Sequence, residues 1–272
     1  MKKPRRFQRS QARNNAAPPG LDRPAASILG MRLNKYIAHS GVASRRQAGD
    51  LVKAGKVKVN GEVLDNPAYQ IKEGDTVEVD GKVVSPSEQF VYILLNKPRN
   101  VITTTSDERD RTTVIDLLGD PRLEQFRLFP VGRLDRETTG LLVITNDGDL
   151  TTRLTHPRYE VAKVYVATLD RDFEPKDLAR MQAGYELEDG PFEVDWACYT
   201  DDRTGGDRRS VTLQIHNGRN RIVRRAFAHL GYTVEKLDRT HLASLDKKSL
   251  PRGFWRFLGE AEVRTLKHFS GK

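Results

Sequence analysis

The chain has 272 residues, a formal net charge of +9 and an isoelectric point near 9.6. This length is typical of about two domains, and the positive charge favours a polyanionic partner, nucleic acid before others. The single cysteine, Cys198, excludes disulfide bonds within the chain and fits a reducing, cytoplasmic setting. Because Cys198 lies among alternating apolar residues, we predict a small buried side chain there rather than a nucleophile.

Metal and membrane chemistry have little support in the sequence. The six histidines lie far apart, and none has the spacing of a common zinc site. No apolar run approaches the roughly 18 residues that a membrane-spanning helix needs, and the N-terminus lacks the apolar core of a signal peptide. We therefore expect no metal, no cofactor and no membrane association.

Residues 1–30 form a basic tail. Its lysines and arginines face a single acidic residue, Asp22, and prolines and alanines fill much of the remainder. Such a segment cannot bury enough apolar surface to order itself, so we predict disorder. As an arm it would add salt-sensitive attraction to phosphates. The alternative is a disordered terminus without a function.

Two short helices followed by small hairpins are predicted between residues 31 and 85. The first helix ends at Gly41. Ser44, with Gln47 three residues later, forms a capping box that begins the second helix, and Gly55 ends it. Alternating valines then surround two strong turn signals, which are Asn60-Gly61 and Asp80-Gly81.

This module resembles the S4 RNA-binding domain over most of its length. The resemblance is carried by Met31-Arg32-Leu33-Asn34-Lys35-Tyr36-Ile37-Ala38, Ser44-Arg45-Arg46-Gln47-Ala48 and Gly55-Lys56-Val57-Lys58-Val59-Asn60-Gly61-Glu62-Val63. It implies that basic residues of the helix pair contact structured RNA, through phosphates and shape more than sequence. The residues to which this applies are Lys35, Arg45, Arg46 and Lys53.

A second unit, residues 88–268, mixes strands and helices without regular alternation, which predicts an α+β fold with a largely antiparallel sheet. The predicted strands are 91–95, 141–145, 163–169, 192–199 and 210–216. The predicted helices are a turn at 114–118, then 150–155 with Asp149 as its cap, 175–183 and 219–230.

The stretch from Gly132 to Asn146 carries the clearest chemical pattern. It places one carboxylate, Asp135, among arginines and threonines just before an apolar run that predicts a buried strand. Nearby positive charge favours the ionised carboxylate, which beside a rigid strand can act as a nucleophile or base. The alternative is a surface aspartate that pairs with arginine in a solvated loop, and only the rest of the chain decides between the two.

A second pattern is a cluster of arginines near residue 220. Arg221, Arg224 and Arg225 are predicted at i, i+3 and i+4 on one helical face, where like charges repel. The cluster therefore favours a phosphate or a buried carboxylate as partner, and the alternative is neutralisation by nearby acidic residues. On the predicted strand 163–169, alternation points Tyr165 away from the neighbouring valines.

Together these segments resemble the RsuA/RluB family of pseudouridine synthases. The matching motifs are Gly132 to Leu142, Lys163-Val164-Tyr165, Gly218 to Arg225, Leu95-Asn96-Lys97-Pro98, Thr145 to Leu150 and His156-Pro157-Arg158-Tyr159. The resemblance implies that Asp135 is the catalytic aspartate, that Tyr165 contacts the uracil, and that Arg224 pairs with Asp135. Further basic residues expected to bind RNA are Lys97, Arg133, Arg136, Arg219, Arg221 and Arg225.

The implied function is site-specific isomerisation of uridine to pseudouridine in ribosomal RNA, with base flipping and an aspartate-dependent mechanism. Large-subunit (23S) rRNA is the expected partner, and we expect a cytoplasmic monomer. The alternatives are a small-subunit (16S) target, a non-catalytic RNA-binding ribosome-assembly factor, and a DNA-binding regulator suggested by charge alone.

Overall fold

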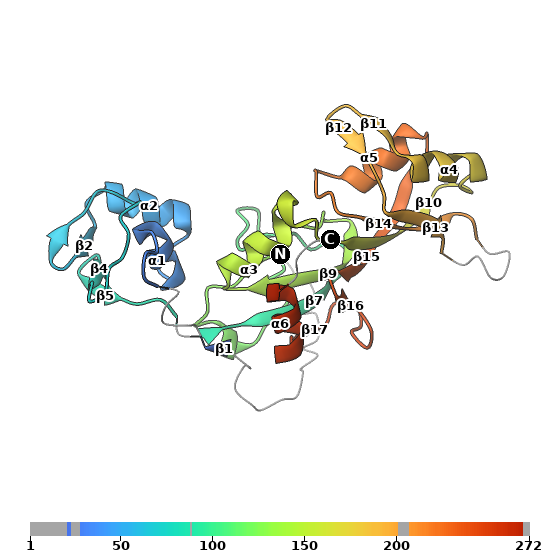
Figure 1. The fold of residues 1–272 in the computed structure, drawn as a ribbon. Helices are drawn as coiled ribbons and strands as arrows, with labels where there is room; N and C mark the ends of the chain where they lie inside the picture. The colour runs from blue at the N-terminus through green and yellow to red at the C-terminus, as the bar shows by residue number, and fades with distance from the viewer. Residues whose placement is uncertain (1–20, 23–27, 88, 201–206, 269–272) are drawn as a thin grey trace. The chain divides into compact units, whose positions relative to one another are not determined.

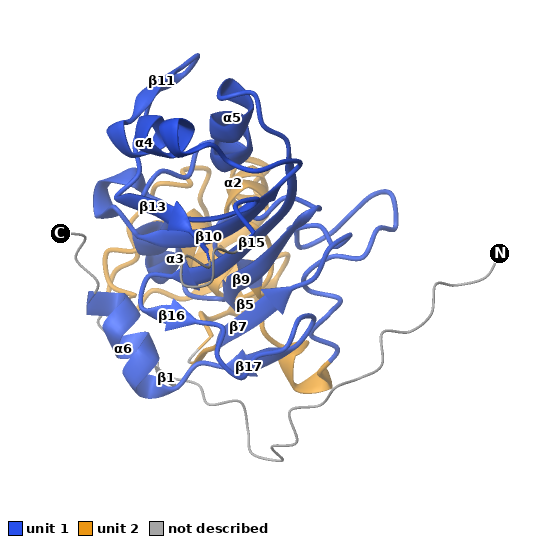
Figure 2. Ribbon diagram, turned by 90° about the vertical axis from the view of Figure 1, so that its right-hand side faces the viewer, with its two compact units in different colours: residues 1–16, 92–119, 129–272 blue, residues 17–91, 120–128 orange. Residues whose placement is uncertain are grey.

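The structure is a computed structural model, and part of the predicted basic tail of residues 1–30 lies outside the residues it describes. Contacts divide the chain into two compact units (Figure 2). The described residues are 21–22, 28–87, 89–200 and 207–268. One unit comprises residues 17–91 and 120–128, and the other comprises 92–119 and 129–272 together with 1–16.

The N-terminal unit contains the helices α1 (Leu33–His39) and α2 (Arg45–Lys53). Ser44 Oγ accepts a hydrogen bond from the Gln47 amide at 3.2 Å, and the Gln47 side chain accepts one from the Ser44 amide at 3.0 Å, which confirms the predicted capping box. A four-stranded sheet has the order β3 (Glu62–Val63), β2 (Val57–Val59), β4 (Val77–Val79) and β5 (Lys82–Val84). A separate strand pair joins β1 (Leu21–Asp22) to β6 (Gln89–Phe90).

The two predicted turns of this unit are confirmed. Asn60 and Gly61 have φ of 54° and 83°, and Asp80 and Gly81 have φ of 48° and 76°. Positive φ at both central residues is the geometry of the tight hairpin turn that joins antiparallel strands. Helices and sheet enclose one apolar core, which leaves the charged side chains of α2 exposed.

The C-terminal unit is built on a nine-stranded sheet in its described residues. β9 and β15 run parallel, whereas the other neighbouring strands are antiparallel, so the predicted α+β fold is confirmed. The order is β13 (Trp196–Tyr199), β14 (Ser210–Ile215), β10 (Lys163–Leu169), β15 (Val234–Leu242), β9 (Thr138–Thr145), β7 (Tyr92–Lys97) and β17 (Trp255–Phe257). Outside this row, β16 (Leu245–Asp246) pairs with β15 and β8 (Phe129–Pro130) pairs with β9.

The helices of this unit lie in two groups (Figures 1 and 2). α4 (Pro175–Ala183) and α5 (Ile222–His229) accompany β10, β13 and β14, together with the hairpin of β11 (Tyr185–Leu187) and β12 (Gly190–Phe192). α3 (Gly148–Thr155) and α6 (Glu260–His268) contact each other beside β7 and β9. The parallel pair β9–β15 therefore joins the two halves of the sheet.

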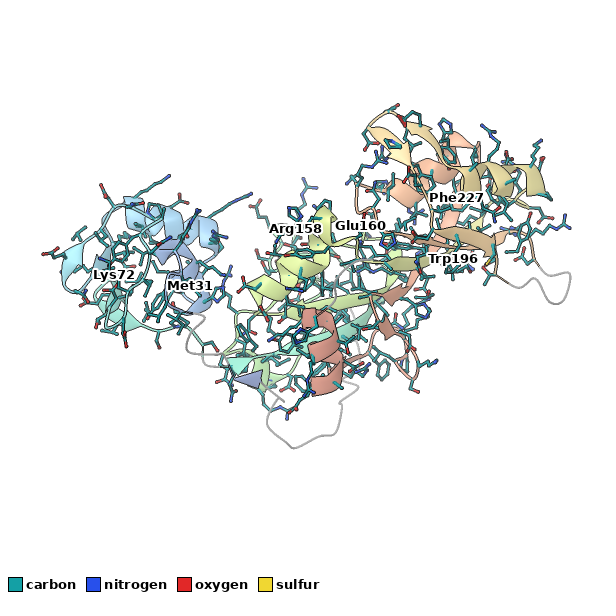
Figure 3. All side chains as sticks on the ribbon, viewed as in Figure 1. Met31, Lys72, Arg158, Glu160, Trp196 and Phe227 are labelled. Atoms are coloured by element: carbon teal, nitrogen blue, oxygen red, sulfur yellow. The ribbon has the colours of Figure 1, made fainter. Side chains whose placement is uncertain are left out.

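Aromatic rings fix α5 against the sheet half that it covers. Phe227, labelled in Figure 3, is fully buried and packs edge-on against Phe173 with ring centroids 5.3 Å apart. Phe173 in turn packs against Tyr232 at 4.9 Å. Such edge-to-face pairs add to the apolar burial of the rings, so the C-terminal part of α5 is held in a defined place.

Four predictions of local structure need correction. The predicted strand 192–199 is interrupted, because β12 ends at Phe192 and β13 begins at Trp196. The helix predicted at 219–230 begins only at Ile222, and α3 is capped by Asp147 instead of Asp149, because the Asp147 side chain accepts from two backbone amides. Cys198 is exposed. It lies on the edge strand β13, where Ala197 is buried and Trp196 and Cys198 are exposed.

Candidate active site

A pocket lies where the two halves of the C-terminal sheet meet. Its lining comes from the loop before β9, the end of α3, the strands β10 and β15, and the segment that leads into α5. Among its described residues Asp135 is the one carboxylate, whereas the charged side chains around it are cations. These cations are Arg133, Lys163, Arg219, Arg221 and Arg239.

Asp135 keeps contact with solvent and with a guanidinium. Its side chain is 33% exposed, and its Oδ2 lies 3.6 Å from Nη1 of Arg221. The loop that carries it leads directly into β9, whose residues are all buried. A carboxylate on a loop just before a rigid strand, paired with a cation inside a pocket, is placed where it can act as a nucleophile.

Lys97 organises the loop that carries Asp135. Its side chain is fully buried, and Nζ donates to the backbone carbonyls of Pro98, Asp135 and Thr138 at 3.1, 3.0 and 2.9 Å. Burial lowers the pKa of Lys97 from 10.5 to about 8, opposed by the charges of Asp135 and Glu137. We expected Lys97 to bind RNA; the structure instead uses its ammonium group inside the protein.

Arg221 stands just before α5 in a left-handed backbone conformation, with φ of 48°. Because α5 begins at Ile222, Arg221 does not share the helical face that we predicted for it with Arg224 and Arg225. A non-glycine residue at positive φ carries backbone strain, and such residues cluster at functional sites. Here the conformation accompanies the contact of Arg221 with Asp135.

Arg224 does not form the ion pair with Asp135 that we expected of it in the described residues. Its Nη1 donates to the Val234 carbonyl at 2.6 Å, and its Nε and Nη2 have no hydrogen-bond partner among the described residues. Burial and the charge of Arg221 lower the pKa of Arg224, against the charges of Asp135 and Glu137. Arg224 therefore lies within electrostatic range of Asp135, but the ion pair is made by Arg221.

Tyr165 lines the pocket from β10 and is 9% exposed. The pairing of β10 with β15 shifts between Val164 and Tyr165, which leaves Thr240 as an extra residue on β15. Such bulges often re-aim side chains next to active sites. As predicted, Tyr165 shares its side of the strand with Lys163, which also lines the pocket.

Two charged residues of the pocket lining, Lys163 and Arg239, were not among our predicted site residues. Lys163 Nζ donates to the carbonyls of Val161 at 2.8 Å and His216 at 2.9 Å. Burial, together with the charge of Arg239, lowers the pKa of Lys163 from 10.5 to about 8. Arg239 lies in β15, for which we predicted no strand, and only 4% of it is exposed.

Arg219 and Arg225 are both paired with Asp189, between β11 and β12. Arg225 Nη1 and Nη2 each donate to the Asp189 carboxylate at 2.8 Å. Arg219 donates to the same carboxylate at 2.9 Å and to the Pro191 carbonyl at 2.5 Å. Acidic neutralisation, the alternative for this arginine cluster, thus holds for Arg225, and it extends to Arg219, while Arg221 faces Asp135.

The other predicted RNA-binding residues lie on the surface. Arg133 and Arg136 are exposed on the loop of Asp135, where Arg136 Nε lies 4.0 Å from Glu137. In the N-terminal unit, three further residues are exposed and one is half-buried. The exposed ones are Arg45, Arg46 and Lys53, and the half-buried one is Lys35.

The described residues contain no cluster of three or more His, Cys, Asp or Glu side chains placed to hold a metal ion. Within the same ranges, every helix is too short or too polar to cross a bilayer.

Known proteins resemble the chain over nearly its whole length. A family model described as RNA pseudouridylate synthase matches residues 91–229, and a model of the S4 domain matches residues 31–77. Ribosomal large subunit pseudouridine synthase B of Bacillus subtilis (strain 168) is 42% identical over 87% of this chain and 95% of that protein. The dual-specificity RNA pseudouridine synthase RluF of Escherichia coli O6:H1 is 34% identical over 87% of this chain and 78% of that protein.

A solved structure supports the same relationship. The crystal structure of a pseudouridylate synthase, 31% identical in sequence, matches with a TM-score of 0.61 over 87% of this chain and 99% of that chain. The chain therefore belongs to the RNA pseudouridylate synthase family, in the RsuA/RluB group, and has an S4 domain at its N-terminus.

Proposed function

We propose that this pseudouridine synthase modifies a specific uridine of ribosomal RNA, in the large subunit. The observation that carries the proposal is Asp135, a partly exposed carboxylate paired with Arg221 in a pocket whose other charged residues are cations. The name of the Bacillus subtilis relative supports the large ribosomal subunit. Exposed arginines on α2 suit the phosphates of a structured RNA.

The reaction breaks the bond between uracil N1 and ribose C1′, turns the base and joins its C5 to C1′. C5 loses a proton and N1 gains one, so the product has the composition of the substrate. Asp135 supplies the carboxylate that this chemistry needs, whether it adds to C1′ or to C6 of the base. Arg221 holds that carboxylate, and Tyr165 contacts the uracil and assists removal of the C5 proton.

The target nucleotide must leave its stack to reach Asp135, which costs about a few kcal/mol. Contacts between phosphates and the exposed guanidiniums of Arg133 and Arg136 offset this cost. The S4 domain positions the RNA through Arg45 and Arg46. We further propose that the enzyme acts as a monomer in the cytoplasm.

The test maps pseudouridines in ribosomal RNA from cells that lack this protein. We expect one large-subunit site to be lost and to return with the wild-type protein but not with Asp135→Ala. Loss of a small-subunit site would contradict the proposed substrate. No change at any site would instead favour an RNA-binding assembly factor that does not catalyse the reaction.

A further inference from the structure

The buried part of the pocket contains a cation for which the reaction described above has no use. Arg239 is 4% exposed and lines the pocket beside Tyr165. Its Nε donates to the Leu141 carbonyl at 2.8 Å, whereas its Nη2 finds no acceptor in the described part of the chain. A guanidinium offers five N–H groups, and the two on Nη2 are buried here without an acceptor among the described residues.

Charge makes this arrangement more unusual. No carboxylate of the described residues forms an ion pair with Arg239. Lys163, which also lines the pocket, is itself a cation, and the charge of Arg239 lowers its pKa. Burial of an unpaired charge destabilises a protein unless other groups compensate. A ligand that brings hydrogen-bond acceptors into the pocket would supply that compensation.

The sheet is built to hold Arg239 in this place. It pairs with Tyr165 of β10 on one side and with Gly140 of β9 on the other. A Cβ atom at Gly140 would lie 2.2 Å from the Arg239 carbonyl oxygen, and Gly140 has φ of 108°, which favours glycine. The close approach of these strands places Arg239 between the strand of Tyr165 and the strand that follows Asp135.

The hydrogen-bonding character of this region distinguishes between pyrimidines. Arg239 and Lys163 can only donate, and their pocket neighbours include the apolar side chains of Leu237 and Leu242. Uracil carries two carbonyl oxygens, which accept hydrogen bonds. Cytosine carries an amino group in place of one of them, so it would set a donor against a cation and leave both unsatisfied.

We propose that Arg239 is a base-recognition residue, whose guanidinium donates to a carbonyl oxygen of the everted uracil and selects uridine over cytidine. Lys163 is the second donor beside it. The same contact stabilises negative charge that develops on the uracil when the N1–C1′ bond breaks, so Arg239 affects the rate as well as the choice of base. This inference rests on the proposed catalysis at uridine, and not on which RNA contains that uridine.

The experiment uses the full-length protein and its variants Arg239→Met and Arg239→Lys. The substrate is total RNA, labelled with tritium at uracil C5, from cells that lack this protein, so that any target is present. Release of tritium reports the reaction. The modified site is then mapped, and two RNA fragments with uridine or cytidine at that site are compared for binding. Arg180→Met serves as the control, because Arg180 is an exposed residue of α4 outside the pocket lining.

We expect Arg239→Met to lower the rate of tritium release roughly 10- to 100-fold, the size of a lost hydrogen bond to a charged group. Its preference for the uridine fragment over the cytidine fragment falls to about one, while Arg239→Lys retains part of both and Arg180→Met matches the wild type. If the methionine variant does not fold, the lysine variant decides by the same two measurements.

Unchanged preference for uridine in folded variants would overturn the proposal and leave Arg239 a structural residue. The same experiment tests the proposed ribosomal RNA substrate independently of the role of Arg239. If the wild type releases tritium only from RNA other than ribosomal RNA, the proposed substrate is wrong, and the comparison of the Arg239 variants on that RNA still decides the role of Arg239.

Discussion

Arg221 Nη1 lies 3.6 Å from Asp135 Oδ2, although Arg221 stands outside the helix that carries the next two arginines. Arg221 has a left-handed backbone conformation, and it contacts a different partner from Arg224, three residues later. Arg221 pairs with the Asp135 carboxylate, whereas Arg224 is more buried and supports the start of β15 through the Val234 carbonyl. Two substitutions separate these roles.

Arg221→Ala is expected to lower single-turnover activity about tenfold, which corresponds to about 1.4 kcal/mol in the activation free energy. Because the Arg221 side chain is 53% exposed, its removal should change the free energy of unfolding by less than about 0.5 kcal/mol. Arg224→Ala should lower the free energy of unfolding by about 1–2 kcal/mol through the lost bond to Val234. Equal loss of stability in both variants would contradict this division.

The pKa of Lys97 predicts a pH dependence of stability. Since burial lowers this pKa from 10.5 to about 8, the unfolded chain binds more protons than the folded protein at Lys97 between these pH values. The contribution of Lys97 to the free energy of unfolding therefore increases as pH rises from 8 to 10.5, and below pH 8 the cost of burying the charge is present in full.

Urea unfolding of the wild type and Lys97→Met at several pH values from 7 to 10 measures this effect. The free energy of unfolding of the wild type minus that of the variant should increase as the pH rises above 8. A difference that is independent of pH would mean that Lys97 has the same pKa in both states.

Arg225 tests whether the arginines that face Asp189 bind RNA. Because Arg225 makes two hydrogen bonds to Asp189, Arg225→Ala should lower the thermal midpoint and leave the salt dependence of RNA binding unchanged. Arg133→Ala, at an exposed pocket residue, should reduce the slope of log K against log salt by about one. A reduced slope for Arg225→Ala would restore its predicted role as an RNA-binding residue.

The exposed arginines of α2 test the positioning role of the S4 domain. The double variant Arg45→Ala/Arg46→Ala should weaken RNA binding and reduce the salt slope by about two, while the single-turnover rate at saturating RNA stays at the wild-type value. Lys82→Ala, an exposed substitution in β5 of the same unit, is the control. If Lys82→Ala weakened RNA binding as much per removed charge as the double variant does, the RNA would be attracted by net charge alone.

The sequence predicts the ends of helices and strands best where neighbouring residues in the chain set them. The helix at 175–183 is confirmed to the residue, because proline at its first position and glycine after its last one define both ends. The capping box at Ser44 is confirmed for the same reason. At Asp135 the motif predicted the supporting strand correctly, and β9 extends it to Thr138–Thr145.

What the sequence did not predict depends on contacts between distant segments. The buried residues of β15 fall at uneven spacing, because the pairing with β10 shifts register twice, and no period of two marks the strand. Arg239 was therefore missed. Helical periodicity also placed Arg221 inside α5, because a left-handed residue before a helix leaves no trace in the spacing of apolar residues.

Asp135→Asn tests the central claim most directly, since it removes the carboxylate charge with little change in shape. The measurement pairs tritium release from C5-labelled ribosomal RNA with the affinity for the same RNA. We predict that Asp135→Asn binds this RNA within about threefold of the wild type, a change below about 0.7 kcal/mol, and releases no tritium. Tritium release at the wild-type rate, or loss of binding together with folding, would contradict the assignment of Asp135 as the catalytic residue.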